Sequence, residues 1–348
     1  REDWKAIPGA VKKFRLIIRE DRHMRKLIVS IAAAAAVCSF AATVSAKTLI
    51  LNSGYPDNNF HTKNIRAFAA DVAKFTDGKL EIDVHSAQEL FKLRETKQAI
   101  QTGQIPMGEI MMPGYGNESP LFMLSGVPFL AASYENSMKL YKAAKPHLDA
   151  YLDKQKLKLL FVVPWPAQAF YTKDAVSKAA DFKGLKFRAY SPMTARLGEE
   201  LGALPTTIEY SEIPQAFATG LVSSMYTSAQ TGIDSQAWDF ANYFTNVGGN
   251  HSLDGTLISK IAYGKLTAVE RKAIDKAAAI AQERGWKMAL QAEKDQVGIL
   301  TNKGMKAPMP SAAFMAELDK IGETLTAEWL KSAGAMGQDI IKSFRAMK

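Results

Sequence analysis

The sequence predicts an α/β protein built on two similar lobes. Three observations support this: strands and helices alternate from Lys47 onward, a helix–glycine–strand unit occurs twice, and a long helical stretch lies near the C-terminus. The 348 residues suit two domains or one large domain. With 47% hydrophobic and 23% charged residues, the composition is that of a chain that buries a core, which excludes disorder and collagen-like repeats.

The mature chain is expected to open with a βαβ unit. Residues 48–52 are rich in β-forming side chains and predict a strand. A polar turn at residues 56–59 leads into a helix, whose stop is Gly78. The apolar residues of this helix recur at helical spacing, at Ile65, Phe68, Ala69, Val72 and Phe75. Residues 80–84 then alternate as a second strand.

A local repeat suggests that the two lobes share a plan. Residues 98–103 lead into a short apolar strand that ends near Met111, and residues 215–220 lead into another that ends near Tyr226. Both units predict a helix, a glycine cap and a strand, and they match at Gln, Ala, Thr and Gly. Ligands of open α/β sheets bind beside the carboxyl ends of strands, so these strand ends are candidate cleft positions.

Helix formers run from Leu266 to Asn302, with Thr267 placed as the cap. A continuous helix of this length would extend roughly 50 Å. It either braces both lobes or is broken into two helices at Gly285 or Gly298.

The N-terminal segment has the order of a secretory signal. Met24 is followed by two basic residues, an apolar and small-residue run over 27–44, and small residues up to Ala46. We expect residues 24–46 to be a cleaved signal peptide, with an uncleaved membrane anchor as the alternative, and residues 1–23 to be a mis-assigned extension. Without residues 1–46 the formal charge falls from +9 to +4, so we expect a periplasmic protein with no nucleic-acid partner.

No catalytic or cofactor motif is found. Cys38, the one cysteine of the chain, lies inside the predicted signal, so thiol catalysis, disulfides and cysteine-ligated metals are not expected in the mature protein. The sequence contains no nucleophile elbow, phosphate-binding glycine loop or zinc-protease helix motif. The histidines of the predicted mature chain stand apart from one another and from acidic clusters: His61, His85, His147 and His251. We therefore expect no enzyme activity, cofactor or metal site.

Arg188 is the strongest candidate for a binding residue. Leu185, Phe187 and Ala189 alternate as the inner face of a strand, which places Lys186 and Arg188 on the other face. A guanidinium at a strand end can hold a carboxylate with two parallel hydrogen bonds. The alternative interpretation is that Arg188 is an ordinary surface arginine.

These residues lie within a pattern that resembles the solute-binding proteins of tripartite ATP-independent periplasmic (TRAP) transporters, the dicarboxylate-binding-protein family. The similarity extends over nearly all of residues 47–340. Its central segments are Gly184–Arg188, Leu204–Pro205, Tyr210–Ile213 and Gln215–Gly220. Further matches are Gly78–Glu81, Gln101–Gly103, Val127–Leu130 and Lys265–Thr267.

The resemblance implies a two-lobed periplasmic binding fold of type II-like organisation, whose cleft closes on an organic acid and whose long helix braces both lobes. It implies lobe I over residues 47–167 plus about 254–290, and lobe II over 168–253 plus about 291–348. In the family, the arginine at the position of Arg188 forms the main carboxylate salt bridge. Gln168 stands where many members have a second arginine, and Thr227 stands where an amide is common.

The expected site therefore holds one carboxylate with a neutral body. We expect it to consist of Arg188, Gln168, Thr227 and Asn52 with the aromatic residues Trp165, Tyr210 and Tyr226. Trp165 and Tyr210 are alternatively plain core aromatics. The resemblance implies a receptor that delivers a small organic acid to the permease subunits of a TRAP transporter; a ligand sensor or a secreted enzyme on the same scaffold are the alternatives.

Overall fold

The computed structural model describes residues 46–347. The predicted extension and, apart from Ala46, the predicted signal peptide lie outside the described residues. No helix within the described part is both long and apolar enough to cross a membrane.

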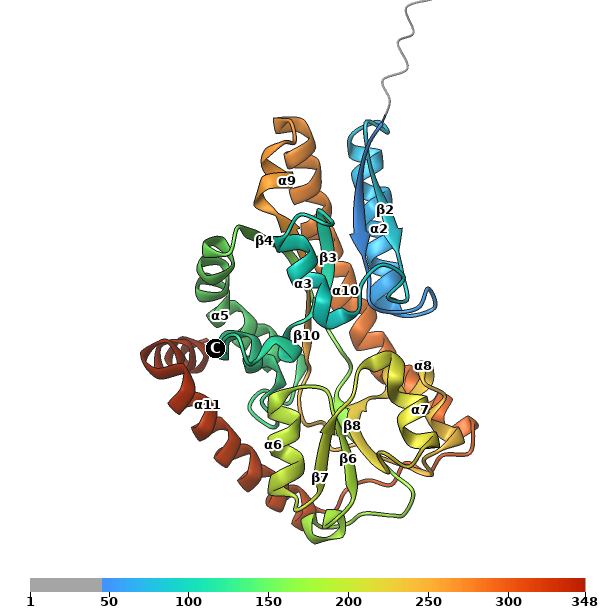
Figure 1. The fold of residues 1–348 in the computed structure, drawn as a ribbon. Helices are drawn as coiled ribbons and strands as arrows, with labels where there is room; N and C mark the ends of the chain where they lie inside the picture. The colour runs from blue at the N-terminus through green and yellow to red at the C-terminus, as the bar shows by residue number, and fades with distance from the viewer. Residues whose placement is uncertain (1–45, 348) are drawn as a thin grey trace, which may run out of the picture. The chain divides into compact units, whose positions relative to one another are not determined.

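Ten strands and ten α-helices are described, and Figure 1 labels most of them. The strands are β1 (Lys47–Asn52), β2 (Leu80–His85), β3 (Met107–Met111), β4 (Leu157–Pro164), β5 (Gln168–Thr172), β6 (Lys186–Ala189), β7 (Leu204–Thr207), β8 (Ser224–Ser228), β9 (Tyr243–Thr245) and β10 (Leu253–Ser259). The helices are α2 (Phe60–Phe75), α3 (Leu93–Gln101), α4 (Pro120–Met123), α5 (Tyr134–Lys154), α6 (Pro192–Glu200), α7 (Ile213–Ala218), α8 (Ala229–Asp234), α9 (Lys260–Gly264), α10 (Ala268–Asn302) and α11 (Ala312–Ala346).

The strands form two five-stranded mixed sheets. The first has the order β2-β1-β3-β10-β4 and the second the order β7-β6-β8-β5-β9. In each sheet one strand runs antiparallel to both of its neighbours: β10 in the first and β5 in the second. We call the sheet of β1 with its covering helices the first lobe and the sheet of β6 with its helices the second lobe (Figure 1).

Two adjacent crossings connect the sheets. The chain leaves the first sheet between β4 and β5 and returns between β9 and β10. Trp165 N donates to Ser252 O at 2.8 Å, and Gln168 N donates to Asn250 O at 3.0 Å. Backbone hydrogen bonds therefore tie the two crossings together, as expected of a hinge that lets two lobes move with only a few changes in dihedral angle.

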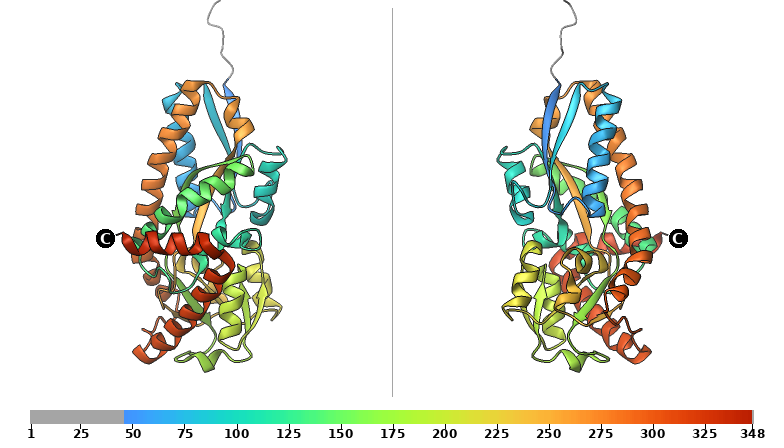
Figure 2. Two further views of the ribbon diagram at one scale, coloured as in Figure 1. Left: turned by 90° about the vertical axis from the view of Figure 1, so that its left-hand side faces the viewer. Right: turned by 90° about the vertical axis from the view of Figure 1, so that its right-hand side faces the viewer.

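The α10 helix braces both lobes. It is continuous over 35 residues, begins with a capping box of Thr267 and Glu270, and contacts α2 and β4 in the first lobe and α8 in the second (Figure 2). Gly285 does not break it. A Cβ at Gly285 would lie 2.4 Å from a methyl of Val163, so the glycine permits close packing of α10 on β4. The predicted α/β two-lobed fold with a bracing helix is thereby confirmed.

The βαβ opening follows the sequence pattern closely. Asn59 caps α2 by accepting a hydrogen bond from His61 N, and Ile65, Phe68 and Val72 are buried on the sheet side of the helix. Gly78 has a φ of 74°, a conformation that favours glycine, and the chain turns there into β2. Strands β1 and β2 pair in parallel along their whole length.

The repeated helix–glycine–strand unit is present in both lobes. It consists of α3, Gly103 and β3 in the first lobe and of α7, Gly220 and β8 in the second. Both glycines have positive φ, 79° and 69°. The carboxyl ends of β3 and β8 both face the space between the sheets, as the lining of the cavity described next demonstrates.

Helix α11 packs across the helices of both lobes. It contacts α5 and α4 as well as α6 (Figures 1 and 2). It is interrupted at Gly334, whose φ of 58° lies in the region that favours glycine, and the segment beyond it continues as a helix against α5.

Candidate ligand-binding site

A cavity lies between the two sheets, beside the hinge crossings. Its lining comes from the residues at or after the carboxyl ends of β1, β3, β6, β7 and β8, the start of α3, and the crossings themselves. The space among these side chains is about 550 Å³ including its mouth. The cavity therefore suits a small molecule, at the strand ends where α/β sheets bind ligands.

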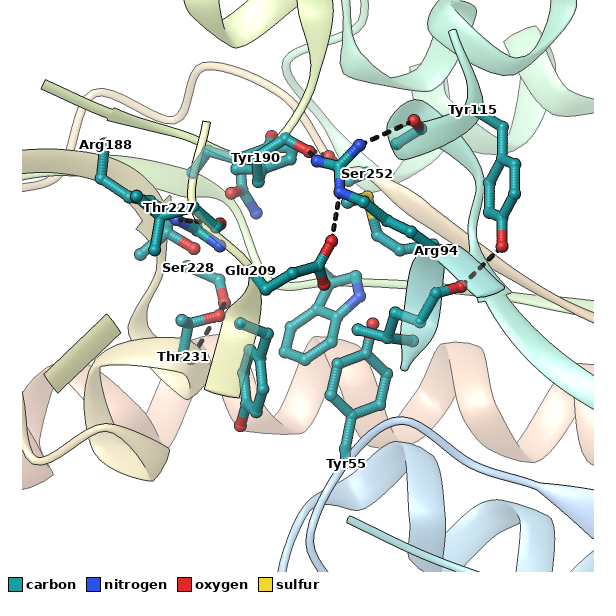
Figure 3. A pocket seen from close by; sticks show the side chains of 17 residues that line it. Tyr55, Arg94, Tyr115, Arg188, Tyr190, Glu209, Thr227, Ser228, Thr231 and Ser252 are labelled. Atoms are coloured by element: carbon teal, nitrogen blue, oxygen red, sulfur yellow. Dashed lines mark hydrogen bonds and ion pairs between the residues drawn. The ribbon is translucent and has the colours of Figure 1, made fainter. Parts of the chain in front are cut away.

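Arg188, from β6, lies in the cavity wall with only 3% of its surface exposed (Figure 3). Its Nε donates to Ile208 O at 3.2 Å, and its guanidinium carbon lies 5.5 Å from the centre of the Tyr190 ring. Burial lowers the pKa of Arg188 to about 10, so the group stays charged at neutral pH. No carboxylate of the described residues lies within ion-pair distance of it.

Arg94, from the start of α3 in the first lobe, is a second guanidinium in the lining of the cavity, and it already has partners. It forms an ion pair with Glu209, and its Nη2 and Nη1 donate to Tyr190 O at 2.8 Å and Gly114 O at 3.1 Å (Figure 3). Arg94 belongs to the first lobe and Glu209 to the second, so this pair also connects the lobes. Among the described residues that line the cavity, the charges of Arg94 and Glu209 cancel and that of Arg188 remains.

Neutral polar groups surround the free guanidinium. Gln168, at the start of β5, is 2% exposed and donates its amide to Pro166 O at 3.0 Å, which leaves its oxygen as an acceptor. The hydroxyls of Thr227, Ser228 and Thr231 line the same side (Figure 3). The second lobe thus offers donors and acceptors with a single uncompensated positive charge.

Aromatic rings from both lobes pack together in another part of the lining. Tyr55 packs edge-on against Trp165, with ring centres 4.8 Å apart, and against Tyr210, with centres 5.1 Å apart. The Tyr55 hydroxyl and Trp165 Nε1 both donate to Asp254, at 2.6 Å and 2.9 Å, so hydrogen bonds hold both rings in place.

Further contacts between the lobes surround the cavity. Asn59 Nδ2 donates to Asp234 Oδ2 at 2.7 Å, Lys92 Nζ lies 3.0 Å from Glu212 Oε1, and the Ser211 hydroxyl donates to Gln88 Oε1 at 3.3 Å. The structure is therefore a closed form in which both lobes contribute to one small cavity.

Five of the seven residues predicted for the site line this cavity: Arg188, Gln168, Thr227, Trp165 and Tyr210. Tyr226 does not. Successive side chains of a strand point to opposite faces, so Tyr226 points away from Thr227 into the core, where its hydroxyl donates to Asn250 Oδ1 at 2.8 Å. Asn52 also lies outside the cavity, because its amide nitrogen donates to Phe91 O and to the Thr96 hydroxyl.

Sequence reasoning missed several lining residues, of which Arg94, Tyr190 and Glu209 matter most. Tyr190 could have been found, because it follows Arg188 by two positions and so points to the same side. Arg94 carried no comparable signal: it comes from α3, ninety-four residues before Arg188 in the chain, and only the packing of the lobes brings the two guanidinium groups to one cavity.

The prediction that the histidines stand apart from acidic clusters is wrong for His61 and also for His85, which lies between Asp83 and Glu89 at the surface. In the structure the His61 ring, the Glu109 carboxylate and the Asp254 carboxylate form a buried cluster whose potential ligand atoms lie within 4.8 Å of one another. The three residues are far apart in the chain, and strand pairing in the first sheet brings two of them together.

Comparisons with known proteins agree with this architecture. The model of the family described as bacterial extracellular solute-binding protein, family 7 (DctP) matches residues 51–332. A curated relative, the C4-dicarboxylate-binding periplasmic protein DctP of Rhodobacter capsulatus, is 26% identical over 258 residues, which cover 67% of this chain and 73% of that protein.

Two solved structures are more similar. DctP7 of Bordetella pertussis, an extracytoplasmic solute receptor that binds pyroglutamic acid, is 40% identical and covers 86% of this chain and 100% of its own, with a TM-score of 0.85. A TRAP solute-binding protein from a marine metagenome, specific for pyroglutamate, is 37% identical, covers 87% and 99%, and also has a TM-score of 0.85. The two lobes, the bracing helix and the extent of the family match show that this chain belongs to family 7 of the bacterial extracellular solute-binding proteins, the receptors of TRAP transporters.

Proposed function

We propose that this receptor binds a small monocarboxylate of the pyroglutamate type and delivers it to the permease subunits of a TRAP transporter. The observation that carries this proposal is Arg188: a buried guanidinium that faces a closed cavity and has no carboxylate partner among the described residues. An unpaired buried charge is costly, and a ligand carboxylate would satisfy it with two charge-assisted hydrogen bonds.

The charge balance favours one carboxylate rather than two. Arg94 is neutralised by Glu209, so a monoanion cancels the remaining charge of the lining, whereas a dicarboxylate would bury a second negative charge without a partner. The same pair argues against catalysis, because Glu209, the one carboxylate among the described lining residues, is bound to Arg94 and is not free to act as an acid or base.

The neutral part of the cavity complements a lactam ring. Pyroglutamate carries one carboxylate on a five-membered ring with one N–H donor and one carbonyl acceptor. Gln168 and the hydroxyls of Thr227 and Thr231 offer both acceptors and donors, and the rings of Trp165 and Tyr210 cover an apolar face. The ligands of the two similar structures support the same choice.

Calorimetry with three ligands tests the proposal. We expect pyroglutamate to bind the purified protein at least about tenfold more tightly than succinate, which has a second carboxylate, or 2-pyrrolidinone, which has the ring but no carboxylate. Comparable binding of 2-pyrrolidinone would contradict the role of Arg188, and tighter binding of succinate would contradict the monoanion.

The proposal includes export to the periplasm and the lobe boundaries given above. Cleavage of the signal peptide after Ala46 would release a chain that begins with Lys47, the first residue of β1. N-terminal sequencing of periplasmic protein tests this, and a start well upstream of Lys47 would contradict it. Uptake of labelled pyroglutamate by vesicles that contain the permease, with and without this receptor, tests the transport partnership.

A further inference from the structure

The cluster of His61, Glu109 and Asp254 lies in the first lobe, behind the aromatic wall of the cavity. His61 belongs to the first turn of α2, Glu109 to β3 and Asp254 to β10, so three separate elements contribute one side chain each. The three residues are 1%, 2% and 2% exposed, and their potential ligand atoms lie within 4.8 Å of one another. None of the three lines the organic-acid cavity.

The imidazole of His61 is held by packing, and its nitrogens are left without partners. The ring stacks on Trp165 with centres 4.5 Å apart and packs against Phe60 with centres 4.3 Å apart. Nδ1 lies 3.2 Å from Glu109 Oε1, but without the alignment of a hydrogen bond, and neither ring nitrogen has a hydrogen-bond partner among the described residues. Buried polar atoms are almost always paired, so two free nitrogens on one buried ring require an explanation.

The two carboxylates also lack a permanent counter-charge. No lysine or arginine of the described residues forms an ion pair with Glu109 or Asp254. Two buried carboxylates without a positively charged partner are costly, and a bound cation would balance them.

Outer hydrogen bonds orient both carboxylates toward the cluster. The Ser53 hydroxyl donates to Glu109 Oε2 at 2.8 Å. Trp165 Nε1 and the Tyr55 hydroxyl donate to Asp254 at 2.9 Å and 2.6 Å. Metal-binding carboxylates are commonly fixed by a second layer of donors in this way.

We propose that His61, Glu109 and Asp254 form a site for one divalent transition-metal cation of the zinc type. One imidazole nitrogen and two carboxylate oxygens are ligands that such cations accept, and a charge of +2 would balance the two carboxylates. Calcium and magnesium fit less well, because they prefer six or more oxygen ligands. The site shares Trp165 and Tyr55 with the organic-acid cavity but does not use Arg188, so it stands independently of the proposed function.

Zinc binding to the purified protein tests this site directly. After removal of metal with a chelator, we expect calorimetry and elemental analysis to show one tightly bound Zn²⁺ per chain, together with a higher melting temperature, because the cation would bind the folded state alone. Since the cluster is buried, the metal is also supplied during refolding from denaturant.

Two variants distinguish zinc bound at this cluster from zinc bound adventitiously at the surface. Glu109→Gln keeps the shape of the side chain and removes one ligand charge, and we expect it to weaken zinc binding by more than about tenfold. His85→Gln is the matched control. His85 lies partly exposed with Asp83 at 3.2 Å and Glu89 at 3.1 Å, so it is the same combination of residue types at the surface, and its replacement should leave zinc binding unchanged.

His61→Phe provides a second test if Glu109→Gln does not fold. Phenylalanine keeps an aromatic ring in the stack and removes both nitrogens, and it should also abolish the bound zinc. The proposal is overturned if the folded wild-type protein holds no stoichiometric zinc by either route, or if zinc is lost in His85→Gln and retained in the cluster variants.

Discussion

The two sides of the cavity differ in chemistry. Both sides contribute aromatic rings, but the second-lobe side also presents the free guanidinium of Arg188 with an amide and hydroxyls, whereas the arginine of the first-lobe side is already paired. One side can hold a carboxylate and orient a polar ring, and the other excludes water once the lobes meet. In the proposed function Arg188 holds the ligand carboxylate, whereas contacts across the cleft hold the two lobes together.

The largest loss of ligand affinity is expected when Arg188, the proposed partner of the ligand carboxylate, is replaced. Arg188→Ala should weaken pyroglutamate binding by about two orders of magnitude or more, because a hydrogen bond to a charged group contributes about 1.5–3 kcal/mol and a buried unpaired carboxylate costs more. Arg188→Lys should recover only part of the affinity, since an ammonium group lacks the planar fork.

Lys186→Ala is the matched control for this position, because Lys186 lies on the same face of β6 but is exposed and donates to Gly220 O. Calorimetry should show wild-type affinity for it. If Arg188→Ala bound pyroglutamate with an affinity within a few-fold of the wild type, the second-lobe side would not be the side that holds the carboxylate.

A smaller effect is expected when the pair between the lobes is broken. Arg94→Ala leaves the Glu209 carboxylate unpaired beside the ligand, which changes the charge of the described lining from +1 to zero. We expect roughly tenfold weaker binding of a monocarboxylate, or about 1.4 kcal/mol. The double variant Arg94→Ala/Glu209→Gln should recover most of this loss. If the double variant bound as weakly as the single one, positioning by Arg94 and not charge would be the cause.

We expect the aromatic rings of the lining to contribute less to ligand affinity than either guanidinium group does. Trp165→Phe keeps a ring against Tyr55 and removes the hydrogen bond from Nε1 to Asp254. The net contribution of one such bond to a charged acceptor predicts a loss of about 1.5 kcal/mol or more in the free energy of unfolding and a loss of affinity of only a few-fold. Denaturant titration and calorimetry measure the two quantities. A loss of affinity as large as that of Arg188→Ala would mean that the wall itself holds the ligand.

The smallest effect is expected for the exposed pair at the rim. Lys92 and Glu212 lie 3.0 Å apart with side chains 52% and 49% exposed, so solvent and salt weaken their attraction. Lys92→Ala should change ligand affinity by less than about twofold at physiological ionic strength. A larger change in calorimetry would show that rim contacts and not the cavity control closure.

The local elements of this protein could be predicted well from the sequence. The βαβ opening lies where the alternating and helical patterns place it, and Thr267 caps α10 as expected. Such patterns depend on neighbours within a few positions, which a single sequence displays. Gly285 marks the limit of this reasoning, because a glycine within a helix can break it or admit a close neighbour, and only the packing against Val163 distinguishes the two.

The candidate site was predictable in part. The strand pattern and the family resemblance both predict Arg188 as a binding residue, and the structure places it in the cavity wall. Tyr226 precedes Thr227 on β8, and the alternation of side chains along the strand turns its ring into the core, away from the cavity that Thr227 lines.

The sequence by itself determined the fold class and the first guanidinium, because these follow from the alternation of strands and helices and from one intact motif. That the long helix continues through Gly285 was decided by its packing on β4. Only the tertiary structure decided which side chains meet. Arg94 pairs with Glu209, and His61 joins Glu109 and Asp254, across separations of more than forty residues in every case. Such contacts arise when strand pairing, here the antiparallel pair of β3 and β10, and the packing of the two lobes bring distant segments to one place, and no local pattern in the chain encodes the outcome.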